Sequence, residues 1–260
     1  MNPPRFTFLD HPGPIAFAHR GGAAENPENT WASFRHAHDL GYSYMETDVH
    51  ATKDGVVAVI HDPDLRRVAG EPLLVRDVTW ADLSKMVLTG GERVPRLQDL
   101  LEEWPSLRWN IDAKHASVVA PLAEALRRSA AVERVCITSF ADRRLAEMKR
   151  LLGPRLCTAL GPATITALRI LSLAPGPTAK LLHRTFEGFG AAQVPTRRGS
   201  IPIVEPRFLR AARAAGLQVH VWTIDREAEM ERLLDLGVDG IMTDRPTLLK
   251  DVLQRRGAWV

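Results

Sequence analysis

Two short stretches of the chain place a histidine beside other charged residues. The first, His19-Arg20-Gly21-Gly22, follows an apolar run, and the second, His61-Asp62, ends another. Taken alone, either histidine is better interpreted as a hydrogen-bonded residue at a strand end. Together they favour acid–base chemistry, because imidazole titrates near neutral pH and a pair can remove one proton and donate another. Gly21 and Gly22 would let the backbone turn close to a bound anion.

Carboxylates and a lysine stand at strand-like spacing in two further stretches. Alternation along "YMETDVH" puts Glu46, Asp48 and His50 on one face of a strand, and "NIDAKH" does the same for Asp112 and Lys114. Carboxylates two residues apart can share one hard cation. Such a cation, the arginine and the lysine would offset charge on phosphoryl oxygens while the histidines move protons. The set therefore suits cleavage of a phosphate ester.

The elements that position these residues follow an alternating β and α pattern. Runs rich in β-branched or aromatic residues predict strands near 15–19, 43–49, 107–113, 134–139, 155–160, 191–195, 218–223 and 239–243, with amphipathic helical patterns between them. A further run at 56–61 lies too close to 43–49 to be its parallel neighbour, since a parallel crossover needs a dozen or more residues.

Asp54-Gly55, flanked by apolar alternation, predicts a hairpin over 46–61 that places His61 opposite Thr47 and near Glu46 and Asp48. Eight strands remain, the number that closes a (β/α)8 TIM barrel. We expect a single α/β domain over 1–260, with a small insertion at about 62–95 after the hairpin. The charged residues then share the carboxyl rim, where barrel enzymes build their sites.

Composition limits the classes of function and the location. The chain has 260 residues, 45% of them hydrophobic, and a net charge of +3, which favours an anionic small molecule and gives no basic stripe for nucleic acid. Cys136 and Cys157 lie in apolar runs and are interpreted as reduced core residues. No signal peptide or apolar stretch long enough for stable membrane insertion is evident, so the expected location is cytoplasmic.

Several other residues have two interpretations. Trp222 and Phe140 could form an apolar wall for substrate or belong to the core, and Gln193 could bind a substrate hydroxyl or be a satisfied interior group. Asn26, before Pro27, predicts a helix N-cap, and Asp244-Arg245 before Pro246 predict a cap of the last helix.

The motifs "AHRGG…ENPENT", "METDVHATKDGVVAVIHD", "NIDAKH", "VHVWTID" and "GVDGIMTDRP" together resemble the glycerophosphodiester phosphodiesterase family, from residue 18 to 246. The resemblance implies a TIM barrel that hydrolyses glycerophosphodiesters to glycerol 3-phosphate and an alcohol with a divalent metal ion, Ca2+ or Mg2+. By the same resemblance, His19 and His61 match the acid–base pair, Arg20 and Lys114 the phosphate-binding cations, and Glu46, Asp48 and Asp112 the metal ligands. The resemblance leaves Glu28 open as a residue facing the site.

Three positions depart from the family pattern. Asp112 stands where the family usually has glutamate, Asp225 where asparagine is common, and Arg66-Arg67-Val68 where a threonine-rich turn often follows. The catalytic set implied by the resemblance is unaffected by these differences.

Other functions fit parts of the same pattern. A related barrel phospholipase, of the sphingomyelinase D or phosphatidylinositol-cleaving type, predicts an apolar rim, and a non-catalytic glycerophosphoryl-binding barrel predicts a damaged acid–base or metal set. A metal-dependent nuclease lacks the basic stripe interleaved with aromatics that it needs. The sequence leaves open the alcohol head group, the preferred cation, the roles within the histidine pair, direct attack by water against a cyclic phosphate, and the oligomeric state.

Overall fold

The computed structural model describes residues 5–173 and 179–260. Its centre is a barrel of parallel strands in the order β8-β7-β6-β2-β1-β13-β12-β9, and a bridge between Ala159 and Ala191 joins the two outer strands. The eight strands are β1 (Ile15–Ala18), β2 (Tyr44–Ala51), β6 (Arg108–Ala113), β7 (Val135–Thr138), β8 (Cys157–Thr158), β9 (Ala191–Val194), β12 (Gln218–Val221) and β13 (Gly240–Thr243). Each falls on a run predicted from the sequence, and the TIM-barrel prediction is confirmed.

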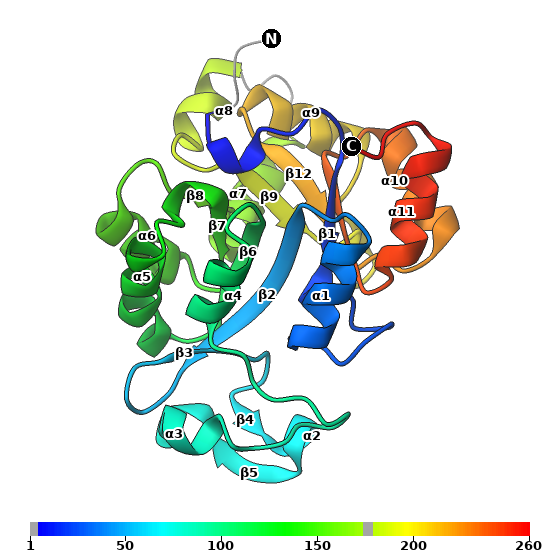
Figure 1. Cartoon of the computed structure of the whole chain (residues 1–260). Helices are drawn as coiled ribbons and strands as arrows, with labels where there is room; N and C mark the ends of the chain where they lie inside the picture. The colour runs from blue at the N-terminus through cyan, green and yellow to red at the C-terminus, as the bar shows by residue number, and fades with distance from the viewer. Residues whose placement is uncertain (1–4, 174–178) are drawn as a thin grey trace.

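Amphipathic helices surround these strands (Figure 1). They are α1 (Trp31–Asp39), α4 (Leu97–Glu103), α5 (Val119–Arg128), α6 (Asp142–Leu152), α7 (Pro162–Leu171), α8 (Ala179–Thr185), α9 (Pro206–Ala214), α10 (Glu227–Leu236) and α11 (Pro246–Arg255). In α9, for example, Phe208, Leu209 and Ala212 face the strands while Arg207 and Arg210 are exposed. Each fully buried Leu or Phe side chain contributes about 1.5–3 kcal/mol to folding. Packing of the buried faces of these helices against the barrel therefore holds the strands in place, and with them the polar residues at the strand ends.

Helix α1 begins later than the sequence predicted. Thr30 is its N-cap: the Thr30 hydroxyl accepts a hydrogen bond from the Ser33 N–H, and the Ser33 hydroxyl accepts one from the Thr30 N–H. Asn29 has a φ of +56°, so the chain is not helical there. The prediction that Asn26 caps the helix is wrong, because this reciprocal capping box satisfies two backbone N–H groups at once.

The hairpin prediction is confirmed. β2 and β3 (Val57–Val59) are antiparallel, with Val49 opposite Val59 and Ala51 opposite Val57, and Gly55 takes the left-handed φ of +80° in the turn. Continuing this register places His61 opposite Thr47, as expected. The returning arm thereby brings His61 back to the carboxyl end of the barrel.

Residues after β3 form a small layer beyond the barrel mouth (Figure 1). It contains β4 (Asp64–Leu65), α2 (Arg66–Ala69), β5 (Glu71–Leu74), the 3-10 turn η3 (Val75–Asp77) and α3 (Trp80–Leu83), and β4 pairs with β5. Its apolar side chains pack into a separate cluster comprising Ala58, Ile60, Leu65, Val75, Leu83, Leu88 and Val94. The layer is held to the hairpin through this cluster, which fixes the position of α2.

The opposite end of the barrel is closed by the turn η1 (Thr7–Leu9), whose Phe8 packs against Phe17 and Tyr44. Cys136 and Cys157 are buried free thiols in the same cluster, as predicted. Among the described residues, no helix combines the length and apolar character needed to cross a membrane.

Candidate active site

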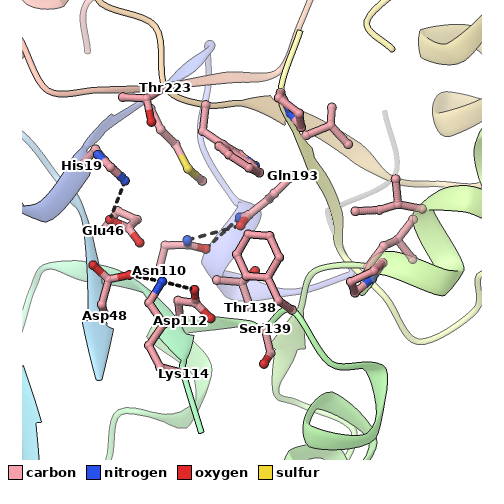
Figure 2. A pocket seen from close by; sticks show the side chains of 18 of the residues that line it. His19, Glu46, Asp48, Asn110, Asp112, Lys114, Thr138, Ser139, Gln193 and Thr223 are labelled. Atoms are coloured by element: carbon pink, nitrogen blue, oxygen red, sulfur yellow. Dashed lines mark hydrogen bonds and ion pairs between the residues drawn. The ribbon is translucent and has the colours of Figure 1, made fainter. Parts of the chain in front are cut away.

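A cavity of about 520 Å3 opens at the carboxyl end of the barrel. All ten residues that the sequence predicted for the site line it: His19, Arg20, Glu46, Asp48, His61, Asp112, Lys114, Phe140, Gln193 and Trp222. Figure 2 shows several of them converging from different strands on one space. Their roles in the chemistry stay predictions.

The register of β2 and β6 brings the acidic residues together. Asp48 lies opposite Asp112, and Lys114 Nζ lies 2.8 Å from Asp48 Oδ1 and 2.7 Å from Asp112 Oδ2. Arg20 Nε lies 3.0 Å from Asp48 Oδ2 on the other side. Burial would raise the pKa of Asp48, but Lys114 and Arg20 outweigh it and hold the pKa below its ordinary value. Asp48 is therefore an ionised carboxylate between two cations.

Glu46 has weaker compensation. Its carboxylate is buried and close to Asp48, and burial followed by that neighbouring charge raises the pKa of Glu46 to about 7. The Arg20 backbone N–H donates to Glu46 Oε2 at 3.1 Å. A buried carboxylate with a raised pKa is a group whose negative charge is not fully balanced by the protein itself.

The three carboxylates supply only oxygen donors, which suit a hard divalent cation. Asp112 Oδ1 is buried without a hydrogen-bond partner, and burial raises the pKa of Asp112. Within residues 5–173 and 179–260, no three histidine, cysteine, aspartate or glutamate side chains are close enough to form a ready-made metal site. Lys114 and Arg20 hold oxygens of Asp48 and Asp112 instead. The donor chemistry and the free oxygen fit a Ca2+ or Mg2+ ion, and the carboxylates would have to converge further on it.

His19 is held between two carboxylates directly after β1. Its Nδ1 lies 2.6 Å from Asp244 Oδ1, and its Nε2 lies 3.7 Å from Glu46 Oε2. Burial lowers the pKa of His19, but Glu46 and Asp244 together outweigh burial and raise the pKa above its ordinary value. Asp244 was predicted to cap the last helix, and this prediction is wrong: its side chain orients His19, and α11 has no side-chain cap.

The turn after His19 depends on its glycines. Arg20, Gly21 and Gly22 all have positive φ, and a Cβ on Gly21 would lie 2.4 Å from Ser33 Oγ. A Cβ on Gly22 would lie 2.7 Å from the ring of Pro246. Only glycine fits at these two positions, so the "HRGG" stretch is built to hold Arg20 toward the cavity.

His61 has a carboxylate partner of its own. His61 Nδ1 lies 2.6 Å from Asp62 Oδ1, and Asp62 Oδ2 accepts a hydrogen bond of 2.6 Å from Arg67 Nε. The sequence contained the adjacent His-Asp pair, but only the fold brings Arg67 to it. Glu28, which the sequence left open, receives hydrogen bonds from both Arg67 and Arg20.

The other side of the cavity is largely apolar. Phe140 and Trp222 meet edge to face at 6.0 Å, and Lys114 Nζ lies 5.8 Å from the Phe140 ring centre. The remaining apolar side chains on this side, which we call the apolar wall together with Phe140 and Trp222, are Leu160, Pro162, Ile165, Val194, Pro195 and Ile203.

Gln193 lies deeper in the barrel. It donates to Asn110 Oδ1 at 2.7 Å, accepts from the Asn110 amide at 3.3 Å and lies 3.3 Å from His220 Nδ1 (Figure 2 shows the pair with Asn110). Its amide is thus already paired inside the protein, in agreement with the interior alternative, although its atoms also line the cavity.

The chain is similar in sequence to known proteins. A sequence model described as "Glycerophosphoryl diester phosphodiesterase family" matches residues 19–248. The chain is 40% identical to a protein of Mycobacterium tuberculosis named probable glycerophosphodiester phosphodiesterase 2, over 98% of this chain and 97% of that protein. It is 28% identical to human lysophospholipase D GDPD1, over 93% of this chain and 86% of that protein.

Solved structures share the fold. A crystal structure described as a putative glycerophosphoryl diester phosphodiesterase from Silicibacter pomeroyi has a TM-score of 0.79 and 24% identity, over 98% of this chain and all of that chain. A phosphodiesterase from Oleispira antarctica, solved with its product sn-glycerol-3-phosphate, has a TM-score of 0.73 and 22% identity, over 93% of this chain and 97% of that chain.

Proposed function

Because the chain belongs to the glycerophosphoryl diester phosphodiesterase family, and is therefore a phosphoric diester hydrolase, we propose that it cleaves glycerophosphodiesters to sn-glycerol 3-phosphate and an alcohol. In this proposal His19 and His61 are the acid–base pair, and the reaction depends on a Ca2+ or Mg2+ ion. The observation that carries it is that both histidines line one cavity together with two cations, Arg20 and Lys114, and three carboxylates.

Arg20 and Lys114 bind the phosphate in this proposal. Both are largely buried, and both are held by carboxylates on strand β2 or β6, so their charges are fixed in place before substrate arrives. Fixed cations in a partly buried site stabilise phosphoryl charge more than the same groups in water. A divalent ion held by Glu46, Asp48 and Asp112 would add further charge stabilisation at the phosphoryl oxygens.

The histidines move the protons. One accepts the proton of the nucleophile, and the other donates a proton to the leaving alcohol oxygen. Each Nδ1 faces an aspartate, Asp244 or Asp62, which leaves Nε2 of each ring for the reaction. Both direct attack by water and attack by a substrate hydroxyl to give a cyclic phosphate are compatible with this pair.

The test is release of glycerol 3-phosphate from glycerophosphocholine, glycerophosphoethanolamine and glycerophosphoglycerol, with EDTA and then with Ca2+ or Mg2+ restored. His19→Ala and His61→Ala should each lower kcat by about 10²–10⁴-fold. His38→Ala is the matched control, since His38 is an exposed histidine on α1 and does not line the cavity. Turnover that survives EDTA, or that survives loss of either cavity histidine, would contradict the proposal.

A second candidate substrate is a lysophospholipid, a glycerophosphodiester that carries one acyl chain. The apolar wall favours it, and Phe140, which lines the cavity, is exposed at its surface. If the wall binds the chain, kcat/KM should rise with acyl length by about fourfold per buried methylene, since each contributes about 0.8 kcal/mol. Lysophosphatidylcholines of increasing length, kept below their micelle concentration, test this against glycerophosphocholine. A flat series would rule the acyl chain out.

We propose further that the whole chain is one barrel domain with an insertion over about 62–95, and that its substrate is a small molecule with no nucleic acid involved. Location in the cytoplasm stays a prediction from the sequence.

A further inference from the structure

Arg67 connects three segments that are distant in the sequence. It lies on α2 of the layer beyond the barrel mouth, yet its guanidinium reaches two carboxylates outside that helix. Arg67 Nε donates to Asp62 at 2.6 Å, and its two terminal nitrogens donate to the two oxygens of Glu28 at 3.0 and 2.6 Å. All three nitrogen atoms of the guanidinium therefore donate a hydrogen bond to a carboxylate.

Each of these carboxylates also contacts a residue of the proposed chemistry. Asp62 lies 2.6 Å from His61 Nδ1, and Glu28 accepts two hydrogen bonds from the Arg20 guanidinium at 3.2 and 3.3 Å. Arg67 thus completes a chain of contacts from His61 on the hairpin to Arg20 on the first strand's turn. Arg20 in turn forms an ion pair with Asp48.

The geometry requires a guanidinium. The fork of one arginine can bind Glu28 in a bidentate manner while its Nε faces Asp62, whereas the ammonium of lysine is a single point that cannot span both. Burial would raise the pKa of Asp62, but its hydrogen bonds with Arg67 and His61 hold the pKa below its ordinary value. Without Arg67, Asp62 would lose one of the two groups that fix its orientation.

We propose that Arg67 is a positioning residue that, by clamping Asp62 and Glu28, holds His61 and Arg20 in a fixed relation across the mouth of the cavity. The proposal rests on the function proposed above. Arg67 itself is half exposed, and ion pairs at such positions contribute little to global stability. Its loss should therefore affect turnover far more than folding.

The first experiment compares Arg67→Gln, Arg67→Lys and Arg66→Gln with the wild-type protein. Arg66 is the matched control, because it is an exposed arginine on the same helix and its side chain lies outside this network. Arg67→Gln should lower kcat by about 10–100-fold with KM within about threefold, as is typical when a partner of a catalytic group is lost. Arg67→Lys should recover part of kcat, and Arg66→Gln should match wild type.

The second experiment tests whether Arg67 acts through Asp62. If it does, Asp62→Asn combined with Arg67→Gln should be little worse than Asp62→Asn alone, since effects within one network are not additive. Fully multiplied losses would overturn the proposal. So would a loss confined to KM, which would make Arg67 a residue that binds the head group, and so would a kcat for Arg67→Gln equal to that of Arg66→Gln.

A measurement that needs no turnover separates this inference from the proposed function. The imidazole NMR signals of His61, assigned with a His61→Gln variant, should broaden or shift in Arg67→Gln and stay unchanged in Arg66→Gln. Unchanged signals in both would overturn the positioning role even if the enzyme is active. A wild-type protein with no turnover, but with His61 signals that respond to Arg67→Gln, would contradict the proposed function alone.

Discussion

Histidines occupy two chemically different regions of this barrel. At the mouth, Nδ1 of His19 and of His61 each lies 2.6 Å from an aspartate oxygen. In the interior, His220 on β12 is fully buried, and its two nitrogens face the side-chain amides of Gln193 and Gln218 at 3.3 and 3.0 Å. The same side chain therefore has a carboxylate partner in one region and amide partners in the other.

The difference teaches what sets the charge of a buried imidazole. Burial lowers the pKa of both His19 and His220, but only His19 has carboxylates that reverse the effect. Burial alone brings the pKa of His220 to about 3, so this ring is neutral at physiological pH. A neutral ring can donate one hydrogen bond and accept another, which matches its two amide neighbours. His19 is thus suited to proton transfer and His220 to packing.

The largest expected effect comes from removing a carboxylate partner at the mouth. Asp244→Asn leaves the shape nearly unchanged but removes the charge that orients His19 and stabilises its protonated form. We expect kcat to fall by about 10²–10³-fold, with a similar loss for Asp62→Asn through His61. Steady-state kinetics on glycerophosphocholine checks both.

Asp225→Asn is the matched control for Asp244→Asn. The same charge is removed nearby, but Asp225 Oδ1 only accepts from the Thr243 hydroxyl and the Asp244 N–H, and an asparagine oxygen can do the same. Its kcat should stay within about twofold of wild type. Equal losses in the two variants would mean that general charge near the mouth matters, and not the contact with His19.

A smaller effect is expected from acid on the interior histidine. The folded-state pKa of His220 is lowered to about 3 from an ordinary 6.5, so its contribution to stability is present above pH 6.5 and is lost as pH falls toward 3. Between pH 7 and pH 5 this one residue should cost about 2 kcal/mol of unfolding free energy. Urea unfolding of wild type and of His220→Gln at both pH values measures this cost. It is the difference between the two proteins in how much the unfolding free energy falls from pH 7 to pH 5.

Gln218→Glu would give His220 a carboxylate partner, as His19 and His61 have at the mouth. A carboxylate 3.0 Å from Nε2 would favour the protonated ring, so the loss of stability between pH 7 and pH 5 should shrink in this variant. His19 works in the opposite direction: its raised pKa adds stability at low pH that is lost as pH rises. If the unfolding free energy depends on pH in the same way in wild type, His220→Gln and Gln218→Glu, then other groups control the loss of stability in acid.

Features that depend on residues close together in the chain were predictable from the sequence. The strands followed from their apolar runs, and the Asp-Gly turn fixed the hairpin register that brings His61 to the mouth. The spacing of Glu46 with Asp48, and of Asp112 with Lys114, placed each pair on one strand face. Local backbone geometry determines all of these features.

Contacts between distant segments were not predictable in the same way. Asp244 lies 225 positions from His19, and beside Pro246 it has the local pattern of a helix cap, which concealed its role. Arg67 and Glu28 are 39 positions apart and meet only because the layer beyond β3 folds back over the mouth. The prediction for Asn26 was wrong because Thr30 and Ser33, which follow it in the sequence, together make a better cap.

The smallest expected effect comes from the apolar wall, which has no group that transfers protons. Phe140 is 64% exposed and packs edge to face with Trp222, so Phe140→Ala removes little folding energy but opens one side of the cavity. We expect KM to rise about three- to tenfold with kcat nearly unchanged, since the lost contact stabilises bound substrate and transition state equally. Val87→Ala, an exposed apolar residue that does not line the cavity, should leave both constants unchanged. A fall in kcat as large as the rise in KM would place Phe140 with the mouth histidines in the chemistry, because the ring would then help to hold Lys114, whose Nζ lies 5.8 Å from its centre.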